Sequence, residues 1–121
     1  MKELTEVLFQ YLKNNTPELS FTRIENSTAL GTPDALVYNN KHTFFTIELK
    51  VTKRYKLRFS PHQISFHVRH PYNSFIIATT AAACYPILYE GHQIRQLATS
   101  GLKLAPCVRG LEAIYKKLRE L

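Results

Sequence analysis

The sequence predicts an α/β fold (α+β in some classification schemes) with a mixed central sheet flanked by helices. A helical apolar period at residues 4–13 and a strand-like alternation at residues 42–51 support this prediction. A near-continuous apolar run at residues 74–80 is typical of a buried central strand. With 121 residues, the chain is long enough for one sustained core, so we expect a single domain over residues 1–121.

The first predicted element is an amphipathic helix over residues 4–13. Its apolar residues recur at helical spacing and are expected to face the core: Leu4, Val7, Leu8, Tyr11 and Leu12. Glu3 lies nearer the edge of that apolar stripe than Glu6. The helix is expected to end at residues 14–17, Asn-Asn-Thr-Pro.

Residues 19–26 are predicted to form the first strand, in which Phe21 and Arg23 share one face. The polar residues at its end come shortly before a tight turn. Arg23 could contact a phosphate group, and Glu25 could reach a metal ion. A cross-strand ion pair is the plainer explanation of the same residues.

Two further strands are predicted to form a β-hairpin. Residues 42–51 are rich in β-branched and aromatic side chains, residues 35–38 form a shorter strand, and Asn39-Asn40-Lys41 between them is typical of a turn. A three-residue loop pairs Tyr38 with His42. One face of the longer strand then carries its apolar side chains: Phe45, Ile47, Leu49 and Val51.

The register of this hairpin decides the position of Asp34, the only aspartate in the chain. With a three-residue loop, Asp34 lies opposite Thr46 and shares a face with Glu48 and Lys50. A two-residue loop would turn Asp34 to the other face. We expect the first register, which places two carboxylates and an ammonium group together.

This combination of groups is suited to a hard divalent cation. Mg²⁺ takes oxygen ligands and is typically held by one or two carboxylates together with substrate phosphates. Asp34 and Glu48 would supply the carboxylates, and the backbone carbonyl of Leu49 a third oxygen. Lys50 could orient a metal-bound water or stabilise developing negative charge. The alternative is a surface strand with an ordinary Glu/Lys pair.

A clear helix start follows at Ser60-Pro61-His62-Gln63. Ser60 is a natural N-cap, Pro61 suits the first helical position, and Gln63 stands at the capping-box position, a role that needs no catalysis. Pro71 ends the helix. The histidines on or just past it are interpreted as phosphate contacts or as ordinary surface residues: His62, His67 and His70.

Beyond the buried strand at residues 74–80, a further strand is predicted at residues 85–89, and Pro86 assigns it to an edge of the sheet. Residues 91–97 are predicted to form a short helix. Residues 107–120 are predicted to form the last helix, whose apolar stripe could complete the core or serve a dimer.

These motifs together resemble the PD-(D/E)XK nuclease superfamily. Gly31-Thr32-Pro33-Asp34 followed by Ile47-Glu48-Leu49-Lys50 matches its pattern, and Ser60-x-x-Gln63 stands where the pattern continues with a helix. Within the superfamily, the chain is most similar to small VRR-NUC-type and Holliday-junction-resolvase-like nucleases, including stand-alone phage forms. The resemblance covers roughly residues 3–90.

The resemblance implies a restriction-endonuclease-like αβββαβ core, followed here by an extra C-terminal helix. It also implies dependence on Mg²⁺, with Mn²⁺ as a substitute, and hydrolysis of phosphodiester bonds. By position, Asp34, Glu48 and Lys50 carry over as catalytic residues. Gln63 carries over as an accessory to them.

Family members usually add a glutamate from the first helix, for metal binding or water positioning. Glu6, which is followed by Phe9, fits the family's Glu-x-x-apolar pattern and is the residue we expect there, with Glu3 as the alternative. The Arg-Ile-Glu-Asn-Ser run at residues 23–27 is similar to that preceding Gly-Thr-Pro-Asp in some phage members.

The basic residues are concentrated around the proposed site. The chain carries a net charge of +7, and residues 41–70 contain seven Lys/Arg residues and one acidic residue. Such clustering favours a polyanionic partner, and we expect duplex or branched DNA. A solvated basic loop is the alternative. The residues expected to contact nucleic acid are Arg23, Lys53, Arg54, Lys56, Arg58, His62, His67 and Arg69.

Several protein classes do not fit the sequence. Cys84 and Cys107 lack the spacing of a zinc site or a disulfide framework. No apolar run approaches the ~18–20 residues of a membrane span, and the N-terminus lacks the apolar segment of a signal peptide. We expect an intracellular, cytoplasmic protein, in the host cytoplasm if viral. A nuclease, a non-catalytic nucleic-acid binder and a module that binds an acidic protein remain as function classes. A homodimer is a further expected assembly.

Overall fold

The computed structural model describes residues 2–24 and 30–121, which form helices and strands. The elements are α1 (Lys2–Asn14), β1 (Ser20–Arg23), β2 (Ala35–Tyr38), β3 (Phe44–Thr52), α2 (Pro61–Arg69), β4 (Ser74–Thr80), β5 (Ile87–Glu90), the 3₁₀ turn η1 (Gly91–Gln93), α3 (Ile94–Ser100), the 3₁₀ turn η2 (Gly101–Lys103), β6 (Val108–Arg109) and α4 (Leu111–Arg119). Six strands form one sheet in the order β1-β2-β3-β4-β5-β6. Only β3 and β4 pair in parallel, so the sheet is mixed, as predicted.

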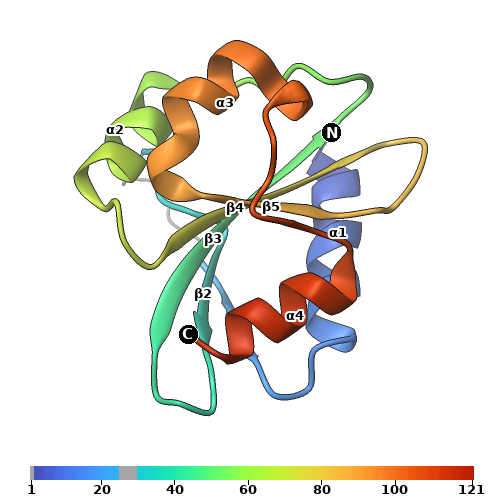
Figure 1. Ribbon diagram of the computed structural model, residues 1–121, viewed down its shortest axis with the longest axis vertical. Coiled ribbons are helices and arrows are strands. Elements are labelled where there is room, and N and C mark those ends of the chain that lie inside the picture. The colour runs from blue at the N-terminus through green and yellow to red at the C-terminus, as the bar shows by residue number, and fades with distance from the viewer. Residues whose placement is uncertain (1, 25–29) are drawn as a thin grey trace.

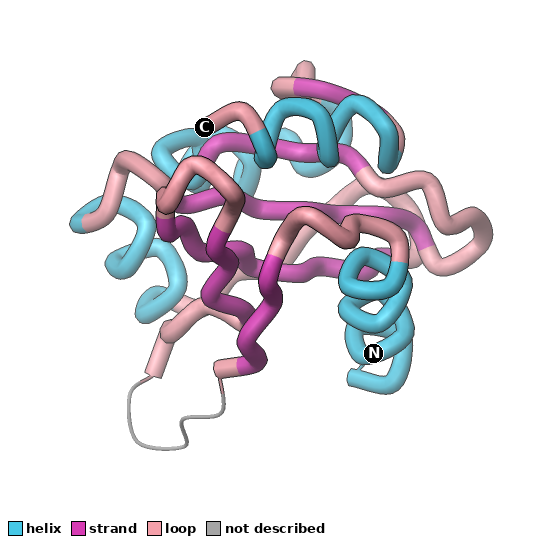
Figure 2. Tube along the Cα trace, turned by 90° about the horizontal axis from the view of Figure 1, so that it is seen from below, coloured by secondary structure: helices cyan, strands magenta, loops and turns pink. Residues whose placement is uncertain are grey.

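Helices cover both faces of the sheet (Figure 1). Helices α1 and α4 lie on one face, and α2 and α3 lie on the other. Figure 2 shows the strands running through the middle of the molecule between these helices. On the first face the core contains Leu8, Phe9, Leu12, Val37, Phe45, Ile47, Leu49, Ile77, Ile114 and Leu118. On the second face it contains Leu57, Ile76, Ala78, Ile87, Tyr89, Ile94 and Leu97.

The face of α1 that packs on the sheet differs from the predicted one. The buried residues of this helix are Leu8, Phe9 and Leu12, whereas Leu4 and Val7 are 39% and 61% exposed. The Phe9 ring packs edge to face against Phe21 of β1, with 5.9 Å between ring centroids. This contact with a residue distant in sequence brings Phe9, rather than Val7, to the sheet.

The change of face also decides which polar residue of α1 turns toward the sheet. Thr5 precedes Leu8 and Phe9 by one helical turn and is partly buried, whereas Glu3 and Glu6 are exposed. The N-terminal end of the buried face therefore presents a hydroxyl group rather than a carboxylate.

The hairpin keeps the predicted bounds of β2, but the predicted register is wrong by two residues. Tyr38 pairs with Phe44 instead of His42, so the loop spans the five residues 39–43. Side chains alternate across a strand, and a shift of two residues therefore preserves every face. Asp34 still lies on the face that was predicted.

The side chain of Asn39 explains the longer loop. Its Oδ1 accepts hydrogen bonds from the N–H groups of Lys41 and Thr43, both at 3.0 Å. Its Nδ2 donates to the carbonyl of Leu118 near the end of α4, also at 3.0 Å. His42 adopts the left-handed conformation within the loop, with φ of 64°. The turn is thus built around a helix terminus that lies 79 residues away in the sequence.

Strand β4 and helix α2 lie where the sequence predicts them, but the C-terminal region differs from the prediction. Strand β5 is not an edge strand, because it lies between β4 and β6. Pro86 precedes β5, and its carbonyl accepts a hydrogen bond from the Gly110 N–H at 2.8 Å. The predicted short helix continues to Ser100, and residues 107–110 form β6 and a turn rather than the start of the last helix.

Strand β1 ends at Arg23, so Ile24 lies outside it, contrary to the prediction. Glu25 and Asn26, the rest of the predicted continuation, lie outside the described residues. Within residues 2–24 and 30–121, no helix is long and apolar enough to cross a membrane.

Gly31 brings the segment before β2 against the first turn of α2. Its φ is +83°, and a Cβ atom placed there would lie 2.3 Å from the backbone oxygen of His62. Only glycine combines this φ with so close an approach of two backbones. The contact fixes the spacing between α2 and the residues that lead to Asp34.

We predict that Gly31→Ala destabilises the fold by about 2 kcal/mol or more, because it adds a clash with immobile backbone to an unfavourable φ. Urea denaturation measures the change in the free energy of unfolding. Gly110→Ala is the matched control, since Gly110 has a similar φ of +86° but a Cβ atom there would lie 3.3 Å from the Tyr85 hydroxyl. Equal losses of stability in the two variants would contradict the assigned contact with α2.

Candidate active site

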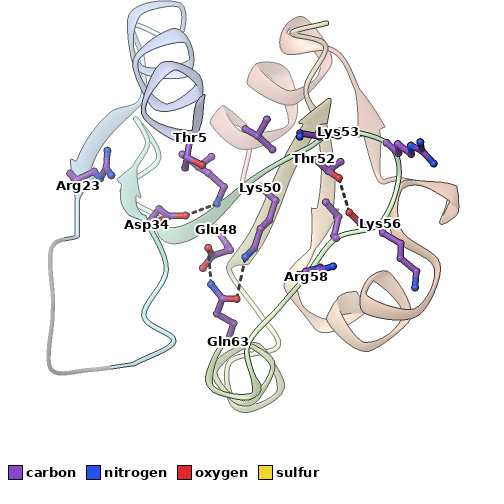
Figure 3. Close-up of a pocket in the computed structure, with 14 residues that line it drawn as sticks. Thr5, Arg23, Asp34, Glu48, Lys50, Thr52, Lys53, Lys56, Arg58 and Gln63 are labelled. Atoms are coloured by element: carbon purple, nitrogen blue, oxygen red, sulfur yellow. Dashed lines mark hydrogen bonds between the residues drawn. The ribbon is translucent and has the colours of Figure 1, made fainter. Parts of the chain in front are cut away.

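A cavity opens where β3 extends past the end of β2 (Figure 3). Strand β2 begins at Ala35, opposite Ile47, while β3 continues beside β4 as far as Thr52. The cavity has a volume of about 790 Å³. Carboxylates, cations and neutral residues together line it: Thr5, Arg23, Asp34, Glu48, Leu49, Lys50, Val51, Thr52, Lys53, Arg54, Lys56, Leu57, Arg58 and Gln63.

Asp34 lies directly before β2, and its carboxylate accepts a hydrogen bond from the part of β3 that extends beyond β2. Its Oδ2 accepts a hydrogen bond from the Leu49 N–H at 2.8 Å. The register places Asp34 next to Glu48 in the sheet, instead of opposite Thr46 as predicted. The N–H and C=O of one strand residue point toward the same neighbouring strand, so the Leu49 carbonyl also faces the side on which Asp34 lies.

Glu48 is a buried carboxyl group in the middle of the sheet, and the residue is only 3% exposed. Burial raises its pKa to about 9, and the negative charge of Asp34 and a hydrogen bond with it act in the same direction, while Lys50 opposes them. Its Oε2 accepts a hydrogen bond from Gln63 Nε2 at 3.3 Å. Its Oε1 is buried and receives no hydrogen bond from a donor group among the described residues.

Gln63 joins the start of α2 to Glu48 and Lys50. The predicted capping box is present, with Gln63 Oε1 accepting from the Ser60 N–H at 2.9 Å and Ser60 Oγ accepting from the Gln63 N–H at 3.1 Å. Because the Ser60 N–H can bond only to an oxygen, it fixes the orientation of the amide. Gln63 Nε2 is thereby directed at Glu48, and Oε1 also accepts from Lys50 Nζ at 3.2 Å. Gln63 therefore caps the helix and orients site residues at the same time.

Lys50 is held in place from two sides. Besides the hydrogen bond to Gln63, its Nζ lies 5.0 Å from the centroid of the Phe59 ring, a cation–π distance. Both contacts come from the segment that enters α2. The ammonium group thus lies beside the two carboxylates on a prearranged side chain.

Helix α1 supplies a hydroxyl, not a carboxylate, to this cavity. Thr5 lines it, whereas the Glu6 carboxylate forms an ion pair with Arg23 and Glu3 is exposed. Among the described residues, no three His, Cys, Asp or Glu side chains come together as a metal site. The structure therefore does not bring Glu6 to Asp34 and Glu48, and Glu25 lies outside the described residues. The apolar residues 8, 9 and 12 share a helix face with residue 5, and this spacing was the signal that could have identified Thr5.

The basic segment after β3 forms one wall of the cavity, through Lys53, Arg54, Lys56 and Arg58. Thr52 Oγ1 donates to the Lys56 carbonyl at 2.7 Å, and the Leu102 N–H donates to the Tyr55 carbonyl at 2.7 Å. The Nζ of Lys103 lies 4.1 Å from the centroid of the Tyr55 ring, a cation–π contact that also fastens this segment. These contacts hold the cationic segment beside the carboxylates.

The residues expected on α2 are only partly placed for binding nucleic acid. His62 and Arg69 are exposed, but neither lines the cavity. The prediction for His67 is wrong, because this residue is completely buried and its Nδ1 bonds to the Gln63 carbonyl at 2.9 Å. Burial lowers the pKa of His67 below its usual value, which favours the neutral ring. A neutral, buried imidazole cannot contact a phosphate.

The donor set fits a hard divalent cation. A buried carboxyl oxygen without a partner, here Glu48 Oε1, must be compensated by a proton or by a cation. The adjacent carboxylate of Asp34 and the Leu49 carbonyl supply further oxygens, and no thiol or imidazole lines the cavity among the described residues. Oxygen ligands on one side and open space on the other are what Mg²⁺ requires when it also binds substrate oxygens.

Comparison with known proteins identifies the fold. No protein-family model matches the chain, and no curated protein matches it. Among solved structures, it is similar to Hjc, a Holliday junction resolvase from the archaeal hyperthermophile Archaeoglobus fulgidus, with a TM-score of 0.57 and 15% sequence identity over 74% of each chain. A protein named SSO0001 matches with a TM-score of 0.43 and 18% identity, over 86% of this chain and 59% of that one. The six-stranded mixed sheet with helices on both faces is thus the restriction-endonuclease-like fold of the resolvase.

Proposed function

We propose that this protein is a Mg²⁺-dependent endonuclease that hydrolyses DNA phosphodiester bonds. The buried Glu48 carboxyl group, with Asp34, Lys50 and Gln63 around it in a cation-walled cavity, is the observation that supports this most directly. This pair of groups is poorly suited to binding DNA by itself, since the charge of the Asp34 carboxylate repels phosphate and the buried Glu48 offers no cation. It is well suited to binding DNA through a metal ion.

The residues of the cavity have separate roles in this proposal. Asp34, Glu48 and the Leu49 carbonyl hold Mg²⁺, with Mn²⁺ as a substitute. When bound, the ion lowers the pKa of a coordinated water and offsets charge on the scissile phosphate. Lys50 orients the attacking water and stabilises the negative charge that develops on the phosphate oxygens. Gln63 fixes the side chains of Lys50 and Glu48 relative to α2 through its hydrogen bonds to both.

The basic wall binds the flanking phosphates. Lys53, Arg54, Lys56 and Arg58 face the same cavity as the carboxylates, so a DNA strand held by them passes the metal site. Neutralisation of phosphates supplies most of the affinity of such binding and makes it dependent on salt. The resolvase likeness of the fold supports selectivity for branched or junction DNA.

We further propose that the chain is a single PD-(D/E)XK nuclease domain of the VRR-NUC or phage resolvase-like type, which acts inside the cell. Resolution of a four-way junction requires two cuts at a fixed separation. A symmetric homodimer supplies two such sites with one kind of interface.

Asp34→Ala is predicted to lower the rate of DNA cleavage by roughly a thousandfold or more, because a metal ligand contributes several kcal/mol of charge stabilisation in the transition state. Glu48→Ala is predicted to have a similar effect. Labelled branched and linear DNAs, incubated with Mg²⁺, Mn²⁺ or a chelator, provide the assay.

DNA binding in the chelator, measured by fluorescence anisotropy, should remain intact in both variants. Glu112→Ala, at an exposed position on α4, is the control and should cleave normally. Unchanged cleavage by Asp34→Ala would refute the assignment of the metal site. Salt-sensitive binding with no cut product from the unmodified protein would instead identify a non-catalytic DNA binder.

The raised pKa of Glu48 predicts how stability depends on pH. The folded protein keeps the proton of Glu48 up to about pH 9, whereas the unfolded chain loses it near the ordinary glutamate value of 4.5. Folding therefore binds a proton between these values, and in a chelator the free energy of unfolding should fall as the pH rises through this window. Denaturation in urea at about pH 5 and about pH 8.5 measures the slope.

Glu48→Gln should flatten this slope, because the amide stays neutral at every pH, while Glu112→Gln should leave it unchanged. In the unmodified protein, Mg²⁺ should raise the melting temperature more at the higher pH, since the cation then replaces the proton on Glu48. A melting temperature that Mg²⁺ does not shift at either pH would count against metal binding at Glu48.

A further inference from the structure

Arg23 supplies a cation on the side of the carboxylates opposite the basic wall. It is the last residue of β1 and pairs with Ala35, which directly follows Asp34. Its side chain lines the cavity and is 29% exposed. Figure 3 shows Arg23 on one side of Asp34 and Glu48, with Lys53, Lys56 and Arg58 on the other. A polyanion that crosses the two carboxylates therefore meets cations before and after them.

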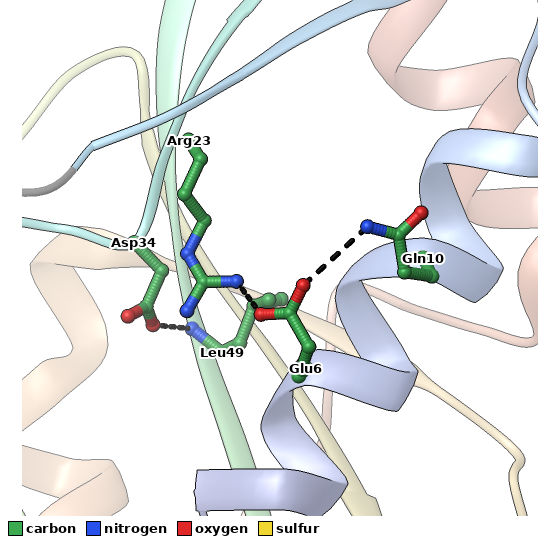
Figure 4. Close-up of polar contacts among 5 residues, drawn as sticks. All are labelled: Glu6, Gln10, Arg23, Asp34 and Leu49. Carbon is green, nitrogen blue, oxygen red and sulfur yellow. Dashed lines mark hydrogen bonds and ion pairs between the residues drawn. The ribbon is translucent and has the colours of Figure 1, made fainter.

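The Arg23 side chain is held by helix α1 (Figure 4). Its Nη1 is paired with Glu6 Oε2, and Glu6 Oε1 accepts a hydrogen bond from Gln10 Nε2, one turn further along the helix, at 3.4 Å. The guanidinium carbon lies 5.1 Å from the centroid of the Phe9 ring. Three residues of one helix face thus direct the guanidinium toward Asp34.

A role in stability does not account for this arrangement. The Glu6 side chain is 49% exposed, and exposed ion pairs contribute little to the free energy of folding. Metal binding does not account for it either, because the Glu6 carboxylate is engaged by Arg23 and lies outside the group formed by Asp34 and Glu48. What remains is the orientation that Glu6 imposes on Arg23.

We propose that Glu6 is a positioning residue, which holds Arg23 at the cavity wall so that its guanidinium contacts the phosphate on the β1 side of the scissile bond. This inference rests on the proposed nuclease function. A guanidinium with a fixed orientation can bind a phosphate in bidentate geometry, which a mobile one does less well. The charge of the Glu6 carboxylate repels DNA. The same carboxylate nevertheless promotes cleavage, because it orients Arg23.

The two effects of Glu6, repulsion of DNA and orientation of Arg23, can be separated by measuring DNA binding and cleavage in the same variants. The full-length protein is compared with Glu6→Gln, Arg23→Gln, the double variant and Glu3→Gln, which removes an exposed carboxylate from the same helix without touching the cavity. DNA binding is measured by anisotropy in a chelator over a range of salt concentrations. Single-turnover cleavage of a labelled four-way junction is measured over a range of Mg²⁺ concentrations.

Arg23→Gln should lower the slope of log affinity against log salt by about one, since one phosphate contact is lost. Glu6→Gln should bind DNA more tightly than Glu3→Gln does, because it frees the charge of Arg23 as well as removing a repulsive one. It should nevertheless cleave roughly tenfold more slowly, the loss expected for a misplaced charged hydrogen bond. The Mg²⁺ concentration for half-maximal rate should not change, and the double variant should be no slower than Arg23→Gln.

Three results would overturn the inference while the protein remains a nuclease. These are normal cleavage by Glu6→Gln, a raised Mg²⁺ requirement in that variant, and a further loss of rate when Glu6→Gln is added to Arg23→Gln. A raised Mg²⁺ requirement would make Glu6 a metal ligand, and a further loss of rate would show that Glu6 acts independently of Arg23. If the unmodified protein cleaves no DNA, the proposed function fails, and binding alone decides the inference. In the Arg23→Gln background, Glu6→Gln must then raise the DNA affinity no more than Glu3→Gln does. If Glu6→Gln raises the affinity equally with and without Arg23, the inference is overturned.

Discussion

The burial of the Glu48 carboxyl group is the constraint on which the site depends. Glu48 lies on β3, a central strand of the sheet, and the residue is only 3% exposed. Desolvation disfavours its charge, and the adjacent carboxylate of Asp34 adds to that cost, so the pKa rises to about 9. The Gln63 amide satisfies one carboxyl oxygen and leaves the other without a partner among the described residues. A site with this imbalance binds a cation or a proton more strongly than a solvated carboxylate would.

The first turn of α2 is the second organising feature, because it contacts both the segment before β2 and strand β3. Gly31 packs against the backbone of His62, which sets the approach to Asp34. Gln63, in the same turn, bonds to Glu48 and Lys50 on β3. The capping box therefore has two consequences. It satisfies N–H groups at the start of the helix. It also orients the Gln63 amide so that Nε2 donates to Glu48 and Oε1 accepts from Lys50.

Charge is distributed so that the carboxylates lie between two cationic groups. The segment after β3 is attached to η2 by the Tyr55 carbonyl and by the contact of Lys103 with the Tyr55 ring. On the other side, helix α1 holds Arg23 through Glu6 and Phe9. Both groups are fixed by contacts between segments distant in sequence. The two cationic groups attract a polyanion, and their fixed positions lead it past the oxygens of Asp34 and Glu48.

Local sequence patterns were enough to predict the order of the main elements, the faces of the hairpin and the group formed by Asp34, Glu48 and Lys50. The same patterns predicted Gln63 as a helix cap, whereas its link to this group was expected only from the family resemblance. Local rules were sufficient there, because strand alternation and helix capping depend on neighbouring residues. Alternation also explains why Asp34 was placed on the correct face although the register was wrong by two residues.

The features that depend on distant partners followed only from the packing of the whole chain. Asn39 organises a five-residue loop against the end of α4. Strand β6 pairs with β5, which Pro86 had suggested to be an edge strand. Packing of Phe9 on Phe21 turned Thr5 to the cavity and left Glu6 for Arg23. His67, polar and placed on a predicted surface helix, is buried instead. In each case a contact between residues distant in sequence outweighed a weak local preference. A short stretch of sequence contains no information about such a contact.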